Sequence, residues 1–139
     1  MTRIILTCAA VLGLAAGAAS ATEYHCTLGD KGKNGNWLDR DIIIEHTGGK
    51  TATIYNDRIA QYYTGNRTTE AKVSRDDSKK LIVTWKVLVK GGTSASSLKQ
   101  KYKMSYRASY TKSDGSYRMS AKPLGFGNNW YSSGTCDVK

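Results

Sequence analysis

Hydrophobic and polar residues alternate with a period of two along much of the chain, and no long stretch follows the helical period. The alternation is clearest over residues 98–110. One side carries Leu98, Gln100, Tyr102, Met104, Tyr106, Ala108 and Tyr110, and the other carries Lys99, Lys101, Lys103, Ser105, Arg107 and Ser109. Because successive side chains of a strand point to opposite faces, the pattern predicts a long β-strand with one buried face.

Shorter alternating runs separated by turn signals extend this prediction to the rest of the chain. Gly48-Gly49, Gly91-Gly92 and Asp114-Gly115 each lie between two such runs. We expect about eight strands, near residues 23–28, 41–46, 51–56, 69–75, 80–90, 98–110, 116–122 and 129–138. The short connections favour antiparallel neighbours in an all-β meander. Only residues 57–67 could hold a short helix.

The first 21 residues have the features of a cleaved secretory signal. Arg3 is followed by an apolar stretch to about residue 16, and Ala19-Ser20-Ala21 fits a small-residue cleavage site. We therefore expect residues 22–139 to form a single mature domain without a transmembrane span. The Ala- and Gly-rich signal is typical of a bacterial protein, which would be periplasmic or secreted.

Two cysteines remain once the signal, with Cys8, is removed. Cys26 and Cys136 lie near the two ends of the mature chain, and an exported protein meets an oxidising compartment. We expect a disulfide between the first and last strands. Such a bond favours a small barrel or a strongly curled sheet, with a two-sheet sandwich as the alternative.

The charge is strongly positive and has a predicted location. The chain has 21 Lys and Arg against 11 Asp and Glu, a formal net charge of +10. If the two late strands pair, one face holds Lys99, Lys101, Lys103, Arg107, Arg118 and Lys122, with Lys86 and Lys90 beside them. Such a face attracts anions, so an anionic lipid, a glycan or an acidic protein is a candidate partner. The plainer alternative is a solvated surface that resists aggregation.

Other features point to no chemistry. Outward aromatic residues are few, so we do not expect sequence-specific nucleic-acid binding. The chain lacks the common catalytic motifs, and we expect a non-enzymatic monomer without metal or cofactor. Residues 30–41 are similar to a calcium-binding loop but fit a hairpin loop better. His25 and His46 are weak candidates for metal ligands. Asp76-Asp77 fits a turn. Residues 125–130 form either a binding loop or a turn.

A resemblance covers most of the mature chain. Tyr24-x-Cys26, Trp37, Trp85, Ala121-x-Pro123-x-Gly125-x-x-Asn128 and Gly134-Thr135-Cys136 resemble a group of uncharacterised small secreted proteins of alphaproteobacteria. The resemblance supports the signal and the terminal disulfide and implies no activity.

A looser similarity is to the bacterial inhibitors of C-type lysozyme, which form small antiparallel barrels. Those inhibitors share the early Tyr-x-Cys and the late Cys, and the segment Asp114-Gly115-x-Tyr117-x-x-Ser120-x-Lys122 is similar to one of their hairpins. This chain is longer and strongly basic, and lysozyme is itself basic, so like charges oppose association. We therefore expect a binding domain for an anionic partner, with an inhibitor of a secreted hydrolase as the alternative.

Overall fold

The computed structural model describes residues 19–29, 37–91 and 100–139, and it contains all eight predicted strands. A seven-residue helix, α1, lies in the region expected to hold one. The elements are β1 (Thr22–Leu28), β2 (Asp41–His46), β3 (Thr51–Tyr55), α1 (Arg58–Thr64), β4 (Thr68–Asp76), β5 (Lys80–Lys90), β6 (Lys101–Thr111), β7 (Ser116–Pro123) and β8 (Trp130–Val138).

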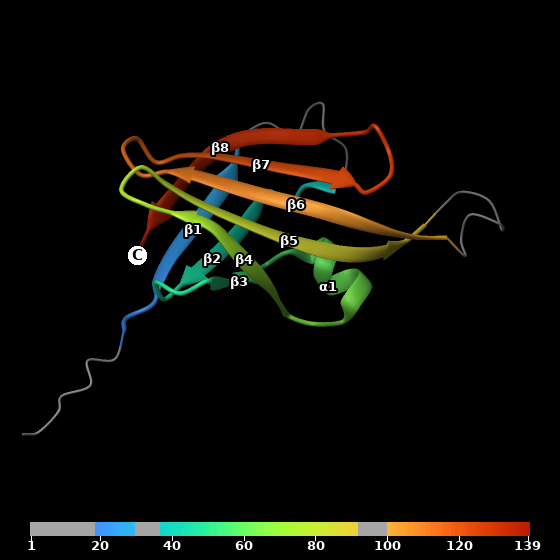
Figure 1. The fold of residues 1–139 in the computed structure, drawn as a ribbon, viewed down its shortest axis with the longest axis horizontal. Coiled ribbons are helices and arrows are strands. Elements are labelled where there is room, and N and C mark those ends of the chain that lie inside the picture. Colours follow the sequence, from blue (N-terminus) through green and yellow to red (C-terminus); the bar gives the residue numbers. More distant parts are fainter. Residues whose placement is uncertain (1–18, 30–36, 92–99) are drawn as a thin grey trace, which may run out of the picture.

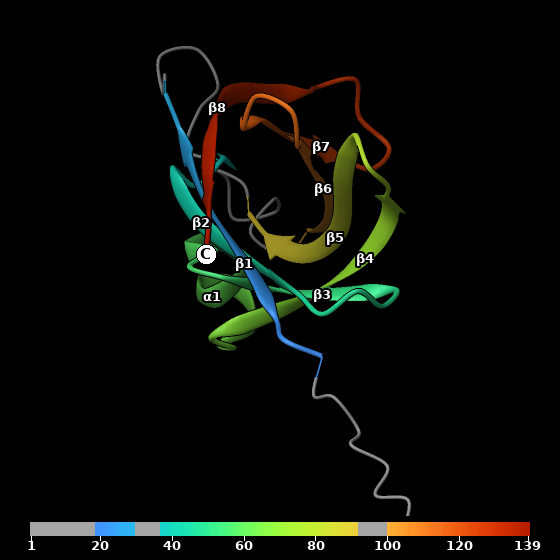
Figure 2. The same ribbon diagram turned by 90° about the vertical axis from the view of Figure 1, so that its left-hand side faces the viewer.

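The strands form a closed antiparallel barrel in which each strand pairs with the next along the chain and β8 pairs with β1 (Figures 1 and 2). The barrel prediction is confirmed, and the sandwich alternative is wrong. Closure leaves no edge strand exposed to pairing with another chain.

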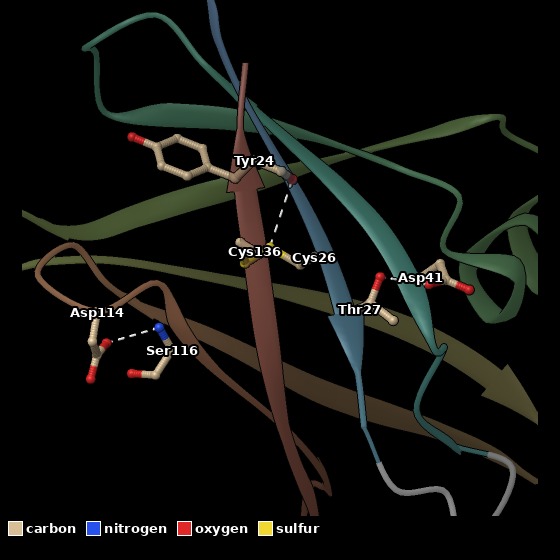
Figure 3. The surroundings of a disulfide bond; sticks show 7 residues. All are labelled: Tyr24, Cys26, Thr27, Asp41, Asp114, Ser116 and Cys136. Carbon is tan, nitrogen blue, oxygen red and sulfur yellow. Dashed lines mark hydrogen bonds between the residues drawn. A yellow bond between two sulfur atoms is a disulfide. The ribbon is translucent and has the colours of Figure 1, made fainter.

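The predicted disulfide lies at the closure. Cys26 of β1 and Cys136 of β8 are directly opposite each other in the ladder, and their sulfur atoms are bonded (Figure 3). Disulfides persist in oxidising compartments, so this bond indicates a non-cytoplasmic environment. Residues 1–18, which contain most of the predicted signal, lie outside the described residues. No helix in the described ranges is long and apolar enough to cross a membrane.

The barrel interior is filled by the alternate residues of every strand. The largest buried side chains include Tyr106, Tyr117 and three isoleucines of β2 and β3, namely Ile42, Ile44 and Ile54. The inward side predicted for residues 102–110 is confirmed. Gln100 is a correction: it was expected to face inward, but it is exposed because it precedes the first residue of β6. Leu98 and Lys99 lie outside the described residues.

One glycine allows β1 and β8 to approach closely. Gly134 lies opposite Leu28, and a Cβ atom at position 134 would be only 1.9 Å from the backbone oxygen of Thr27. A side chain of any size would therefore push against the β1 backbone at the seam of the barrel. The glycine is required here for the close approach of two backbones rather than for an unusual φ angle.

The helix α1 lies at the end of the barrel where β5 ends and β6 begins (Figure 1). Asp57 is its N-cap and accepts a hydrogen bond from the Ala60 amide at 2.9 Å. Gly65 ends the helix in the left-handed conformation. Ala60 is fully buried and α1 packs against β5, so the helix is fixed against this end of the barrel.

Candidate functional site

The outward Lys and Arg side chains of three neighbouring strands form one surface, which we call the basic strip. In the ladder β5–β6–β7, Lys101 lies opposite Lys90, Arg107 opposite Ser120, and Lys122 opposite Ser105. The outward positions of these strands carry no Asp or Glu. The members of the basic strip are Lys80, Lys86, Lys90, Lys101, Lys103, Arg107, Arg118 and Lys122.

The structure brings together the predicted binding residues that it describes. Lys101, Lys103, Arg107, Arg118 and Lys122 all lie on the basic strip, whereas Lys99 lies outside the described residues. The expected pairing of the two late strands is confirmed, as is the position of Lys86 and Lys90 beside them. Lys80 belongs to the same surface and was not predicted, although it continues the outward alternation that contains Lys86 and Lys90.

The opposite wall of the barrel carries carboxylates. Glu23 of β1 and Glu45 of β2 lie opposite each other, and β4 carries both Glu70 and Lys72 at the boundary between the two walls. The outward carboxylates of β1, β2, β4 and β8 are Glu23, Asp41, Glu45, Glu70 and Asp137. The charge on the barrel surface is therefore unevenly distributed, with cations on β5, β6 and β7 and most outward carboxylates on the other strands.

The basic strip contains a hollow of about 340 Å³ near the β7–β8 side. The Arg118 guanidinium lies over the Tyr131 ring, 4.8 Å from its centroid, which holds the cation beside the hollow. Guanidinium groups and hydroxyls are good donors to phosphate, sulfate or carboxylate oxygens. The hollow is lined by Lys80, Arg107, Ser109, Arg118, Ser120, Asn129 and Tyr131.

A second hollow, of about 550 Å³, lies at the α1 end of the basic strip and combines lysines with exposed apolar side chains. Leu88, Leu124 and Phe126, which we call the apolar patch, line it together with Gln100, Lys101, Tyr102 and Lys103. From the sequence, residues 125–130 were expected to form either a binding loop or a turn. That segment connects β7 to β8 and brings Phe126 to the strip, which no period-two pattern could reveal.

A third hollow, of about 580 Å³, lies beside α1 and is lined by Trp37, Asp39, Arg58, Ile59, Tyr62, Tyr63 and Trp130. Desolvation by burial raises the pKa of Asp39 to about 6, and a hydrogen bond with Asp57 adds to the rise. Asp39 also accepts a hydrogen bond from the Ile59 amide at 3.2 Å. Both carboxyl groups thus bind the first turn of α1, and the pair holds the helix against the barrel.

Two tyrosine hydroxyls lie inside the barrel without a partner among the described residues. The Tyr106 and Tyr117 side chains are buried, and neither hydroxyl oxygen has a hydrogen bond there. Burial raises the pKa of both hydroxyls far above the usual range, with the carboxyls of Asp57 and Asp39 as the next cause. Both hydroxyls therefore remain neutral and contribute no charge to the interior.

The residues considered for metal or catalytic chemistry have other partners. His46 is buried, with its Nε2 atom 3.0 Å from Asp76 Oδ2, and His25 lies 2.8 Å from Glu23. Asp77 accepts the Lys79 and Lys80 amides in the β4–β5 turn. Most of the calcium-like loop, residues 30–36, lies outside the described residues. Within the described ranges, no three His, Cys, Asp or Glu side chains come together as a metal site.

The basic strip is therefore the feature in the described residues that best fits a binding role, and the aromatic hollow beside α1 is explained by helix attachment. No protein-family model, no curated protein and no solved structure matches this chain.

Proposed function

We propose that this protein is an exported, non-enzymatic binding domain that holds an anionic partner of the cell envelope or the extracellular medium on its basic strip. The observation that carries the proposal is the register of β5, β6 and β7, which gathers eight cationic side chains on strands that carry no carboxylate. Because like charges repel, such a surface costs folding free energy unless a partner or salt offsets it.

The polarity of the barrel supports binding over general solubility. Lysines that only keep a protein soluble need not be segregated from acids, yet five outward carboxylates lie on the other strands. The hollow around Arg107 and Arg118 adds a place where one anionic group could be held by several donors.

The proposal is tested by charge reversal with a matched control. The strip variant K101E/K103E/R107E and the control variant R40E/K50E/K139E change the net charge equally, but the control residues are exposed and lie off the three strands of the strip. We expect the wild type and the control to be retained on immobilised dextran sulfate at low salt and the strip variant to elute early. Screening should weaken retention at about 0.3 M salt. Equal retention of the two variants would show that only net charge matters.

The alternative proposal is inhibition of a secreted hydrolase such as lysozyme. It is favoured by the closed barrel with its Cys pair and by the segment 114–122, which forms the β6–β7 turn and β7 and presents Lys122 outward. A basic enzyme would be repelled by the basic strip. Titration of lysozyme turnover with the mature protein tests it, since slowed turnover at stoichiometric protein would replace the binding proposal.

Export itself is also a proposal. The cleaved signal at residues 1–21 agrees with the disulfide, because both belong to an oxidising compartment. N-terminal sequencing of protein recovered from the periplasm or the culture medium should give Thr22 as the first residue. A mature chain that still begins with Met1 would contradict it.

A further inference from the structure

We propose that the anionic partner is a lipid bilayer, which the protein meets with the α1 end of its basic strip, and that the apolar patch of Leu88, Leu124 and Phe126 inserts among the headgroups. This inference rests on the proposed function and names the partner. The argument comes from the arrangement of apolar and cationic side chains on adjacent strands.

The apolar patch lies within the lysines rather than beside them. Leu88 is directly opposite Lys103 in the ladder, and the Leu124 amide donates to the Lys103 carbonyl oxygen at 2.8 Å, so Lys103 lies between two leucines. On one side of this row are Lys86 and Lys122, both opposite Ser105. On the other side Lys90 lies opposite Lys101. Cations therefore flank the leucines in both directions along the strands.

The patch is unusually apolar for an exposed surface. Leu88, Leu124 and Phe126 are 45%, 42% and 50% exposed, and they make up three of the six widely exposed large hydrophobic residues in the described ranges. The Phe126 ring packs edge-on against Tyr102, with centroids 5.2 Å apart, which fixes its direction. Three such side chains in one place mark an interaction surface rather than scattered exposure.

A bilayer can bind both the lysines and the apolar patch of this surface, whereas a soluble polyanion can bind only the lysines. Anionic headgroups pair with lysines, and the long lysine stems let the ammonium groups stay at headgroup level while the apolar side chains go deeper. Aromatic rings such as Phe126 and Tyr102 suit this boundary as well. A soluble glycan or nucleic acid would leave the leucines in water.

The other walls of the barrel agree with this orientation. β5 ends, β6 begins and β7 ends at the same end of the barrel (Figure 1), so the patch, whose residues lie at or just after the ends of β5 and β7, belongs to that end. The outward carboxylates lie on β1, β2, β4 and β8, and none lies on the three strands of the strip. A negatively charged surface would repel that wall and attract the strip, which sets one docking orientation.

The test distinguishes insertion of the apolar patch into the bilayer from electrostatic attraction by the lysines. Co-sedimentation is measured with phosphatidylcholine vesicles with and without phosphatidylglycerol, and retention on dextran sulfate is measured in parallel. The variant L88S/L124S/F126S keeps every charge, and V138S is the control because Val138 is equally exposed but lies on β8. We expect the triple variant to lose about tenfold or more in affinity for anionic vesicles and to keep its retention on dextran sulfate. V138S should match the wild type in both.

A second measurement does not depend on the triple variant. The substitution F126W should add a fluorescence component that brominated lipids quench in anionic vesicles, beyond the quenching of the native tryptophans. Unchanged vesicle affinity of a folded triple variant, or no added quenching in F126W, would overturn insertion. Wild-type binding to dextran sulfate but not to vesicles would also overturn it and make a soluble anionic glycan the partner. Binding to neither would instead remove the proposed function itself.

Discussion

Asp57 and Trp85 are joined by a buried hydrogen bond in which the indole Nε1–H donates to Asp57 Oδ2 at 2.8 Å. The other carboxylate oxygen accepts the Ala60 amide, so one side chain caps α1 and also ties the helix to β5. Asp57 is 2% exposed, and a carboxylate this deep is tolerated only because its oxygens are hydrogen-bonded. The attachment of α1 to the barrel therefore depends on this contact.

The substitution D57A should destabilise the fold by about 3 kcal/mol. Loss of an N-cap costs about 1 kcal/mol, and the buried Trp85 N–H left without a partner costs about 1–3 kcal/mol more. Urea denaturation followed by tryptophan fluorescence measures the change. The control is D114A: Asp114 also accepts a backbone amide, from Ser116 at 2.9 Å (Figure 3), but it is exposed. We expect a cost under about 1 kcal/mol there, and equal costs would contradict a buried anchor.

Asp39 should make the stability fall as the pH rises. Its pKa is raised from 3.8 to about 6 in the folded protein, mainly by burial, so between these values the folded state holds more protons than the unfolded state. The free energy of unfolding contributed by this group therefore decreases from about pH 4 to about pH 6 and then stays low. Because Asp39 is half-buried, solvent screening reduces the effect to about 1–2 kcal/mol.

The variant D39N tests whether Asp39 lowers the free energy of unfolding as the pH rises. Asparagine keeps an oxygen for the Ile59 amide and an N–H for Asp57 but carries no charge. Urea denaturation of both proteins should give nearly equal stabilities near pH 4 and a D39N that is the more stable near pH 7, by about 1–2 kcal/mol. A stability difference that does not change with pH would show that the carboxyl of Asp39 is not held protonated by its surroundings.

Much of the fold could be predicted from the sequence because its signals are local. Period-two alternation located β5, β6 and β7, since one side chain in two must enter the barrel. Closure was suggested only by Cys26 and Cys136 and needed the structure, because a pattern of strands does not distinguish a barrel from a sandwich. Gln100 shows the limit of this signal. The alternation of side chains extends N-terminally beyond Lys101, where β6 begins, so the alternation alone does not identify the first residue of the strand.

The cationic residues of the basic strip could be predicted from the sequence, whereas the apolar patch could not. Arg107 and Lys122 alternate with buried residues on strands that follow each other, so their common face could be inferred. Phe126 lies in a connection, and its contact with Tyr102 depends on the path of the chain between β7 and β8. The Asp39–Asp57 pair joins residues on either side of β2 and β3, and no local pattern relates them.

The seam of the barrel should not accept a side chain at position 134. In G134A the new Cβ would meet Thr27 oxygen at 1.9 Å, which forces β1 and β8 apart. Overpacking of this kind costs about 1–3 kcal/mol, and here backbone rather than a flexible side chain must move. The control is G49A, where an added Cβ has no atom within 4 Å. Thermal denaturation should show a lower Tm for G134A and little change for G49A; similar Tm values would contradict the close approach.

The disulfide should be a large part of the stability of this small barrel. Cys26 and Cys136 are 110 positions apart, and in the chain-entropy model a crosslink over such a length stabilises the folded state by about 4–5 kcal/mol, although measured values are often lower. Reduction of the wild type removes the crosslink but leaves both sulfur atoms to fill their sites. The variant C26A/C136A removes the crosslink and the sulfur atoms, which are nearly buried.

Comparison of the three forms separates these two contributions. Urea denaturation should rank the oxidised wild type first, the reduced wild type second and C26A/C136A third. The first difference reports the crosslink, and the smaller second difference reports lost packing, about 1–2 kcal/mol for small buried groups. The ladder hydrogen bonds between β1 and β8 remain in all three forms, so the reduced protein should still fold as a barrel. A reduced wild type as stable as the oxidised one would show that pairing of β1 with β8, and not the covalent bond, closes the barrel.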